Sequence, residues 1–514
     1  MKLKYILILF AILFTSCVKD NSSTDIIPLN NIKIENFEAS YIGTLNESFN
    51  IDPTVTIFDE NVSYLWYIYS DDSKLKIDTI SKEKNLNVVL SGDTFVPGID
   101  YFLVFKVIDN KTNIYESKTA KLVVGSDYTY GQLFLCETDG KIHLDMLRND
   151  NKYFTNIYSL NNQGKILDNT VNKIIIANPL PHNIAFKQIF LFAKNADGGY
   201  ILDPVTMSQK FTIRSLMDEG MKNAILEPTF YSLAGMIEYI IINGKMHKRA
   251  TNMQKISFES DALVAFGGAT TYKVTALLGN DYEPYVYDEL NGRFMRHTTW
   301  NAGALKETTN GGDKSNFDVT NIGDYAMLVN GILNAPMQYW MIGKERSTSE
   351  ISVFKVSTTF PDEWWEALPL TDLQKVRIDA SVGPNFIGAT NIVSSILLPS
   401  RCFYVNKNKV YTLNIENISE NTLGEAELLD LGSQNLTITG LKIVETKVDD
   451  AKNPGSLISM KQLRVMVQDN TLSEKKGGVI YYEISTTSGL MLIENDRFIG
   501  GKCDKVIDIE DKLN

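Results

Sequence analysis

The sequence predicts an all-β protein in which an N-terminal β-sandwich precedes a β-propeller of seven blades. In residues 31–125, apolar side chains recur at every second position, which is the period of a half-buried strand. In residues 126–514, an apolar strand, a tight Asp/Asn/Gly turn and a second strand recur roughly every 55–60 residues. Each such unit is long enough for a four-stranded blade, and a ring of blades leaves few exposed strand edges.

The predicted core of the sandwich centres on Trp66, within the apolar strand Tyr64–Ile68. A turn at Pro97-Gly98 leads into a strand over Tyr101–Asp109, and a last strand covers Tyr115–Val124. About 95 residues with seven or so strands and one central tryptophan favour a two-sheet sandwich.

Seven strand–turn–strand units predict the blades. Their first strands are Gln132–Cys136, Gln188–Phe192, Ile240–Ile242, Tyr285–Asp288, Gln338–Met341, Cys402–Val405 and Gly478–Tyr482. A pair of β-sandwiches is the alternative, because such hairpins occur in both architectures and the spacing is uneven. Few helices are expected, and Thr212–Asn223 and Asp362–Leu368 are the best short candidates.

The N-terminus is typical of an exported lipoprotein. Two lysines precede an apolar run, Tyr5–Phe14, that is too short to span a bilayer. Small residues then precede Cys17, and this arrangement resembles a bacterial lipobox, which implies cleavage before Cys17 and lipid on its sulfur. We therefore expect a signal peptide over residues 1–16 and a polar tether over 17–30. An ordinary signal peptide with an incidental cysteine is the alternative.

Longer segments carry a family resemblance. The segments YLWYI (Tyr64–Ile68) and PGIDYFLVFKVID (Pro97–Asp109) resemble the polycystic-kidney-disease (PKD) type of immunoglobulin-like domain. Tyr130–Leu147 and Gly500–Asp511 are similar to the start and the close of the C-terminal region in the PKD-like family of Bacteroidota surface lipoproteins. This resemblance implies a nutrient-acquisition accessory on the outer membrane, facing the cell exterior beside a TonB-dependent transporter.

Charge and cysteine content restrict the class of protein. The 50 Lys+Arg against 62 Asp+Glu give a net charge of -12, and no basic cluster predicts a nucleic-acid partner. With Cys17 lipidated, three widely spaced cysteines remain, which is not a disulfide framework. One disulfide among Cys136, Cys402 and Cys503 and three buried free thiols both stay open.

Motifs for catalysis or metal binding are missing from the sequence. The four histidines form no His-Glu-x-x-His pattern, and there is no Gly-x-Ser-x-Gly elbow, phosphate-binding glycine loop or EF-hand. The sequence therefore predicts no cofactor, no metal site and no catalytic residue, although histidines that are far apart in the chain can meet in space.

Two aromatic segments are candidate ligand sites. Asp362 and Glu363 precede Trp364 and Trp365, where indole faces could stack on sugars or peptides and carboxylates could accept hydrogen bonds. The second candidate is Arg296–Asn301, which contains Trp300 and leads into the long polar stretch Thr308–Asn316. The alternatives are a helix start whose tryptophans are buried in the core and an ordinary solvated loop.

The resulting hypothesis is a non-catalytic outer-membrane lipoprotein that captures a glycan or peptide. A propeller-type glycoside hydrolase or lyase is the first alternative, since two acids suffice for glycosidase chemistry. A structural subunit of a transporter complex is the second.

Overall fold

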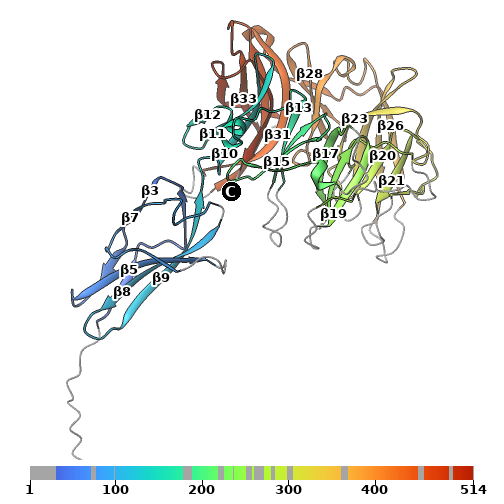
Figure 1. Cartoon of the computed structure of the whole chain (residues 1–514). Helices are drawn as coiled ribbons and strands as arrows, with labels where there is room; N and C mark the ends of the chain where they lie inside the picture. The colour runs from blue at the N-terminus through green and yellow to red at the C-terminus, as the bar shows by residue number, and fades with distance from the viewer. Residues whose placement is uncertain are drawn as a thin grey trace, which may run out of the picture. The chain divides into compact units, whose positions relative to one another are not determined.

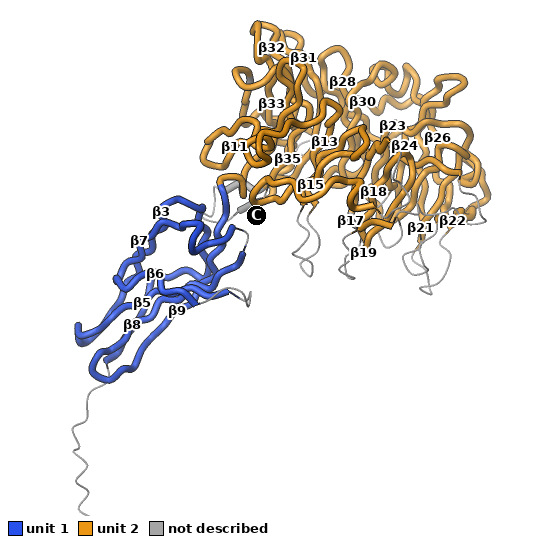
Figure 2. Tube along the Cα trace, viewed as in Figure 1, with its two compact units in different colours: residues 1–126 blue, residues 127–514 orange. Residues whose placement is uncertain are grey.

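A computed structural model of the chain describes residues 30–70, 77–97, 99–177, 188–217, 225–234, 237–250, 257–259, 271–278, 284–297, 305–359, 369–449, 457–485 and 490–512 (Figure 1). The chain divides into two compact units, residues 1–126 and 127–514 (Figure 2). Both units are built from strands in their described residues.

The described residues of the first unit form nine strands in three sheets. The large sheet has the order β2 (Ser40–Thr44), β9 (Tyr115–Gly125), β8 (Asp100–Asp109), β5 (Val62–Ser70) and β6 (Asp78–Ser81). The two small sheets pair β1 (Lys33–Glu35) with β4 (Thr54–Thr56), and β3 (Ser48–Ile51) with β7 (Leu86–Val89). β2 runs parallel to β9, and the other pairs are antiparallel.

Trp66 occupies the centre of this unit, as the sequence predicts. Its side chain is fully buried, its ring stacks on Phe105 at 4.3 Å between centroids, and its indole N–H donates to the Glu83 carbonyl oxygen at 2.9 Å. Alternate residues of β8 face the same core, and all of them are buried: Tyr101, Leu103, Phe105 and Val107. The polar atom of the tryptophan is thus satisfied while its apolar surface is packed.

The second unit is a β-propeller. Its described residues form seven antiparallel sheets, here called blades 1 to 7. Blade 1 consists of β12 (Tyr153–Phe154), β11 (Lys141–Arg148), β10 (Gly131–Thr138) and β35 (Lys505–Lys512). Blade 2 consists of β13 (Val171–Ala177), β14 (Gln188–Ala193), β15 (Gly199–Leu202) and β16 (Gln209–Thr212). Blade 3 consists of β17 (Pro228–Ala234), β18 (Ile237–Ile242) and β19 (Lys245–Ala250).

The remaining blades follow in chain order. Blade 4 consists of β20 (Tyr285–Asp288), β21 (Arg293–His297) and β22 (Leu305–Glu307). Blade 5 consists of β23 (Tyr325–Ile332), β24 (Gln338–Glu345), β25 (Ile351–Ser357) and β26 (Thr371–Ile378). Blade 6 consists of β27 (Thr390–Ser394), β28 (Arg401–Asn406), β29 (Lys409–Asn414) and β30 (Glu425–Asp430). Blade 7 consists of β31 (Leu436–Asp449), β32 (Leu457–Asp469), β33 (Gly477–Ser485) and β34 (Met491–Ile499).

Each of the seven predicted hairpins falls in a different blade. The turn between β10 and β11 shows why the prediction succeeds: Asp139 and Gly140 both have positive φ, at 51° and 69°. Asn243 and Gly244 do the same between β18 and β19, at 53° and 72°. Two-residue hairpins need this left-handed geometry, which Asn, Asp and Gly adopt most readily. The prediction of a seven-bladed propeller is therefore confirmed, and the two-sandwich alternative is wrong.

Seven apolar clusters join the blades, one at each boundary between neighbours. Blades 1 and 2 share one cluster, and the same holds for every consecutive pair up to blades 6 and 7. The last cluster joins blade 7 back to blade 1 through Phe134, Cys136, Met466, Tyr481 and Ile509, among others. Each sheet is covered on both faces by the neighbouring blades. This explains why the sequences of these strands are nearly continuous apolar runs.

The C-terminal strand closes the ring. β35 pairs antiparallel with β10, so blade 1 combines three strands from the start of the unit with one from its end. β35 also contacts β31 of blade 7 and β13 of blade 2. This pairing covers the edge of β10 and links the last strand of the unit to its first blade.

Helices are short in the described residues. The helix predicted over Thr212–Asn223 is wrong where the structure describes it, because Thr212 ends β16 and only a 3₁₀ turn, Arg214–Leu216, follows. Residues 360–368, which include the second predicted helix, lie outside the described residues. A helix at Ile157–Asn161 was not predicted. No described helix is long and apolar enough to cross a bilayer.

Candidate functional site

The residues selected from the sequence lie outside the described ranges. This applies to Cys17, to Trp300 and to the whole Asp362, Glu363, Trp364 and Trp365 segment. Next to Trp300, the described Arg296 and His297 are both buried, so these two side chains are part of the propeller core. The structure instead directs attention to the boundary where blade 7 meets blade 1.

A pocket of about 520 Å³ opens at this boundary and is called here the closure pocket. Its lining comes from both blades: Gln132, Leu147, Arg148, Asn149, Asn151 and Tyr153 on the blade 1 side, and Thr446, Met460, Gln462, Tyr481, Asn495, Asp496, Arg497, Phe498 and Lys502 on the other. A second pocket of about 360 Å³, around Ser400 and Lys461, has no aromatic residue in its lining. The closure pocket is therefore the better candidate for ligand binding.

Aromatic rings and cations stand together in the closure pocket. Tyr153 and Phe498 stack at 5.5 Å between centroids, and Lys502 Nζ lies 4.8 Å from the centre of the Tyr153 ring. Arg148 is ion-paired with Asp150 at 2.6 Å, and Arg497 with Glu494 at 2.8 Å. Arg148 also pairs with Asp127, and Arg497 also donates to Gln434 Oε1 at 3.1 Å, so both guanidinium groups are held in fixed directions.

The base of the closure pocket is held by a buried network. Tyr481 donates its hydroxyl hydrogen to Gln132 Oε1 at 2.8 Å, which connects blade 7 to blade 1. Arg464 is fully buried, donates to Gln462 Oε1 at 3.0 Å and forms an ion pair with Asp511. Arg464 Nη1 and Asp511 Oδ1 have no hydrogen-bond partner among the described residues. Two buried polar atoms with remaining hydrogen-bonding capacity therefore lie beside the pocket.

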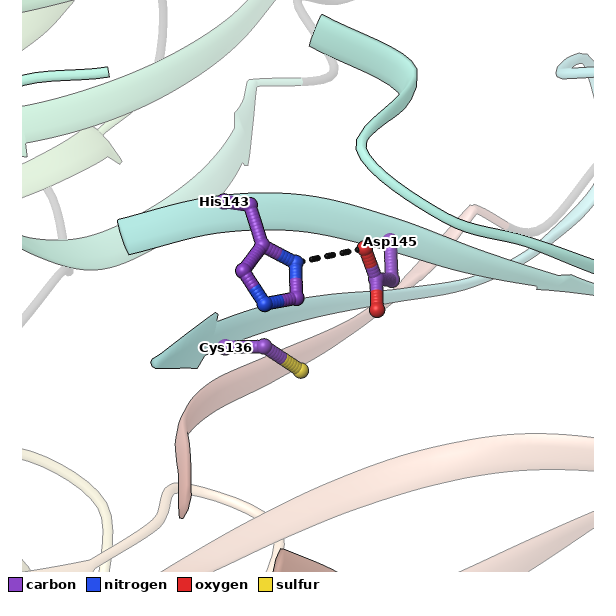
Figure 3. A group of neighbouring side chains, drawn as sticks. All are labelled: Cys136, His143 and Asp145. Atoms are coloured by element: carbon purple, nitrogen blue, oxygen red, sulfur yellow. Dashed lines mark hydrogen bonds and ion pairs between the residues drawn. The ribbon is translucent and has the colours of Figure 1, made fainter. Parts of the chain in front are cut away.

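Behind Tyr153, three potential metal ligands converge (Figure 3). Cys136 lies on β10, and His143 and Asp145 lie on the facing strand β11, where the register pairs Cys136 with His143. One ligand atom from each residue lies within 4.8 Å of the other two. Alternation along β11 puts His143 and Asp145 on one face, toward the same boundary between blades 1 and 7.

Hydrogen bonds hold the two polar members of this cluster in place. His143 Nδ1 lies 2.7 Å from Asp145 Oδ1, and Nε2 lies 2.9 Å from Thr138 Oγ1. Asp145 also accepts from the Tyr153 hydroxyl and from the Asn156 backbone N–H, both at 2.7 Å. Burial and the Asp145 charge raise the pKa of Tyr153 far above its usual value, so this phenol stays protonated.

Cys136 is not an activated nucleophile despite its histidine neighbour. Its side chain is fully buried, and its thiol is in hydrogen-bonding contact with the thiol of Cys503. That contact and burial raise the pKa of Cys136 well above its ordinary value, whereas nucleophilic cysteines need a lowered pKa. The cluster therefore lacks the chemistry of a cysteine hydrolase.

Sequence reasoning did not find this cluster. The alternation His143-x-Asp145 on a predicted strand was a usable signal, because it places both side chains on one face. Cys503 gave no such signal, since its approach to Cys136 depends on closure of the ring. All three cysteines outside residues 1–29 are free and buried in the structure.

One family model matches the N-terminal part of the chain. Residues 17–169 match the PKD-like family. This match spans the sandwich and continues through β10, β11 and β12, so it includes Cys136, His143 and Asp145. No functionally curated protein matches the chain.

Solved structures with similar folds have little sequence in common with the chain. A quinoprotein alcohol dehydrogenase-like protein from Bacteroides thetaiotaomicron has 12% identity and a TM-score of 0.34, with 93% of this chain and 98% of the other covered. A DUF4784 family protein from Bacteroides caccae has 9% identity and a TM-score of 0.29, with coverages of 78% and 96%. PorZ, a surface component of the type-IX secretion system of Porphyromonas gingivalis, has 11% identity and a TM-score of 0.22, with coverages of 76% and 64%. Identities this low give no information on ligand or activity.

Proposed function

We propose that this PKD-like protein is a lipid-anchored surface accessory protein whose propeller binds an oligosaccharide in the closure pocket, without catalysis. The observation that carries the proposal is the pocket lining, in which aromatic rings, amides and cations occur together. Aromatic faces stack on sugar rings, and amide side chains both donate to and accept from hydroxyl groups.

The charges in the pocket favour a glycan that carries carboxylate groups. Three cations line the pocket, namely Arg148, Arg497 and Lys502, whereas Asp496 is the single acid in the described lining. Asp150 and Glu494 already pair with the two arginines, so Lys502 is the cation of the lining that has no ion-pair partner among the described residues. A carboxylate on the ligand could pair with Lys502, so a uronic-acid oligosaccharide matches the site better than a neutral one.

The same lining argues for binding rather than turnover. Glycosidases of the common type use two carboxyl groups on opposite sides of the scissile bond, and the described lining contains one. A lyase needs a base that removes a ring proton. Burial raises the pKa values of Tyr153 and Tyr481, and therefore opposes their use as phenolate bases.

The location and partners of the protein are part of the proposal. The lipobox-like segment before Cys17 supports an anchor in the outer membrane. A surface-exposed binding protein of this kind would pass its glycan, or a peptide in the alternative case, to a neighbouring TonB-dependent transporter. Cys17→Ala should move the protein from the detergent phase to the aqueous phase in phase partitioning. An unchanged distribution would rule out the lipid anchor.

The ligand class is tested by calorimetric titration of the full-length protein with oligogalacturonides and, separately, with maltopentaose. We expect binding of the acidic probe only. Arg497→Gln and Lys502→Gln should each weaken it about tenfold or more, since a hydrogen bond to a charged group contributes about 1.5–3 kcal/mol. Lys165→Gln, at an exposed site outside the pocket, is the matched control. Equal binding of both probes would contradict the charge argument, and release of unsaturated sugars would show a lyase.

A further inference from the structure

We propose that Cys136, His143, Asp145 and Cys503 form a Zn²⁺ site that fastens the C-terminal end of the propeller to its first blade. Three of these residues already present ligand atoms within 4.8 Å of one another. A tetrahedral zinc ion with bonds of about 2.0–2.3 Å separates its ligands by about 3.3–3.8 Å, so a contraction of about 1 Å brings these three ligand atoms into place, and Cys503 has to move in to complete the tetrahedron.

Cys503 supplies the fourth ligand. Cys503 lies outside the group of three ligand atoms within 4.8 Å of one another, but it shares the apolar cluster between blades 7 and 1 with Cys136. The chain is held tightly at this point, because the Gly477 N–H donates to the Cys503 carbonyl oxygen at 2.9 Å. A β-carbon at Gly477 would lie 3.0 Å from Cys503 Sγ. The backbone of Cys503 is therefore held close to Gly477, the first residue of β33.

The combination of ligands matches zinc. Two thiols, one imidazole and one carboxylate are the donor types of structural zinc sites, whereas Ca²⁺ and Mg²⁺ require oxygen ligands. Four protein ligands leave no open position, as expected for a structural ion. On binding, Zn²⁺ displaces one proton from each thiol, and the histidine changes its tautomer so that Nδ1 has a free lone pair.

The hydrogen bonds that His143 and Asp145 make with their neighbours can orient both side chains as metal ligands. With Nδ1 bound to the ion, Nε2–H would donate to Thr138 Oγ1, which lies 2.9 Å away. Asp145 would keep the Asn156 N–H on Oδ1 and the Tyr153 hydroxyl on Oδ2. Only the contact between His143 and Asp145 is exchanged for bonds to the metal. Such outer partners orient the ligands and increase metal affinity.

The site would have a structural purpose. Its ligands come from β10, from β11 and from the segment that leads into β35, so the ion links the two sequence ends of the ring. Tyr153 connects this site to the closure pocket, because its hydroxyl binds Asp145 while its ring lines the pocket. The ion would therefore also fix one wall of the pocket.

The experiment uses the full-length protein, stripped with a chelator under reducing conditions and then titrated with Zn²⁺ or Co²⁺ alone. We expect one equivalent of either ion, with intense thiolate-to-Co²⁺ absorption. Cys136→Ser, Cys503→Ser and His143→Gln should lower the Zn²⁺ affinity more than about 100-fold, and Thr138→Val by about 10–100-fold. Cys402→Ser is the matched control, because Cys402 is equally buried but lies between blades 5 and 6. It should keep full binding.

Several results would overturn the proposal. One is wild-type protein that binds neither ion, or a His143→Gln variant that binds zinc normally. Another is a Cys136–Cys503 disulfide in metal-free protein isolated without reductant, shown by counting thiols after denaturation. His143 is partly exposed, so the His143→Gln variant tests the ligand set even if the serine variants fail to fold.

Discussion

Lys442 Nζ on β31 lies 2.9 Å from Asp508 Oδ1 on β35, and the second oxygen of Asp508 accepts the backbone N–H of Ile174 on β13 at 2.8 Å. One carboxylate thus joins blade 7, blade 1 and blade 2 at the closure of the ring. Lys442 also pairs with Glu510 at 2.8 Å. All three ionic side chains are largely buried, so these contacts are little weakened by solvent.

Lys442→Met should destabilise the propeller strongly. The substitution removes the cation that forms ion pairs with both Asp508 and Glu510, and removal of one partner from a buried pair costs about 3–5 kcal/mol. Chemical denaturation followed by tyrosine and tryptophan fluorescence measures the change. Lys409→Met is the control, because its pairs with Glu427 and Asp430 are exposed and contribute about 0–1 kcal/mol. Equal losses for the two variants would contradict a special role of Lys442 in closure.

Trp66→Ala should unfold or strongly weaken the sandwich. The residue is fully buried against Phe105, and such truncations cost about 3–5 kcal/mol through lost burial and the cavity left behind. Phe58, on the same unit, is 83% exposed, so Phe58→Ala should change stability by less than about 0.5 kcal/mol. Calorimetry of the full chain provides the measurement. A normal melting profile for Trp66→Ala would contradict the central position of this indole.

The elements that the sequence predicted well depend on local chemistry. Asp139-Gly140 and Asn243-Gly244 mark turns because their own backbones favour positive φ, and the alternating residues of β8 show which face is buried. One such hairpin in each blade was enough to predict the number of blades. The helix wrongly predicted from Thr212 shows the limit of local sequence patterns. Thr212 instead ends β16 and pairs with Tyr200, which lies on another strand of blade 2.

The site, in contrast, depends on contacts between distant parts of the chain. Tyr153 and Arg497 line one pocket only because the ring brings blade 7 against blade 1. The thiols of Cys136 and Cys503 meet because β35 joins the first blade. No spacing rule in the sequence contains this information, because the closing strand could pair with either end of the ring. The sequence could therefore predict a propeller without predicting its site.

The stability of the propeller should fall in mild acid because of His297. Burial, with a smaller contribution from Lys248, lowers the pKa of His297 to about 3, and the Tyr239 hydroxyl lies 2.7 Å from its Nδ1. The unfolded chain has a histidine pKa of about 6.5. Between about pH 3 and 6.5 the unfolded state binds more protons, so stability rises with pH in this window and is lost as the pH falls. At pH 5 the loss should reach about 2 kcal/mol.

His297→Gln should reduce that dependence, because the amide stays neutral throughout the range and can still accept from Tyr239. The measurement is the free energy of unfolding at several pH values between 4 and 7, for wild type and variant. The difference in unfolding free energy between wild type and His297→Gln should shrink or reverse as the pH falls. Parallel curves would show that His297 is already protonated in the folded protein or remains neutral when unfolded.

Gly477→Ala should weaken the closure of the ring at one defined point. A β-carbon there would lie 2.9 Å from the Cα and the N of Lys505 and 3.0 Å from Cys503 Sγ, closer than ordinary packing allows. Two of these three atoms belong to the backbone, so no side-chain rotation relieves the contact, and the Gly477 N–H to Cys503 carbonyl bond must shift as well. Overpacking of this kind costs about 1–3 kcal/mol.

Gly92→Ala provides the control for this change, because nothing lies within 4 Å of the β-carbon that it would add. Its effect on the propeller should be negligible, since Gly92 lies in the other unit. If the four-ligand site exists, Gly477→Ala should also weaken Zn²⁺ binding, because it displaces Cys503 without removing any ligand. A variant that loses stability but keeps its full affinity for Zn²⁺ would show that β35 is held by strand pairing alone and that Cys503 is not a ligand.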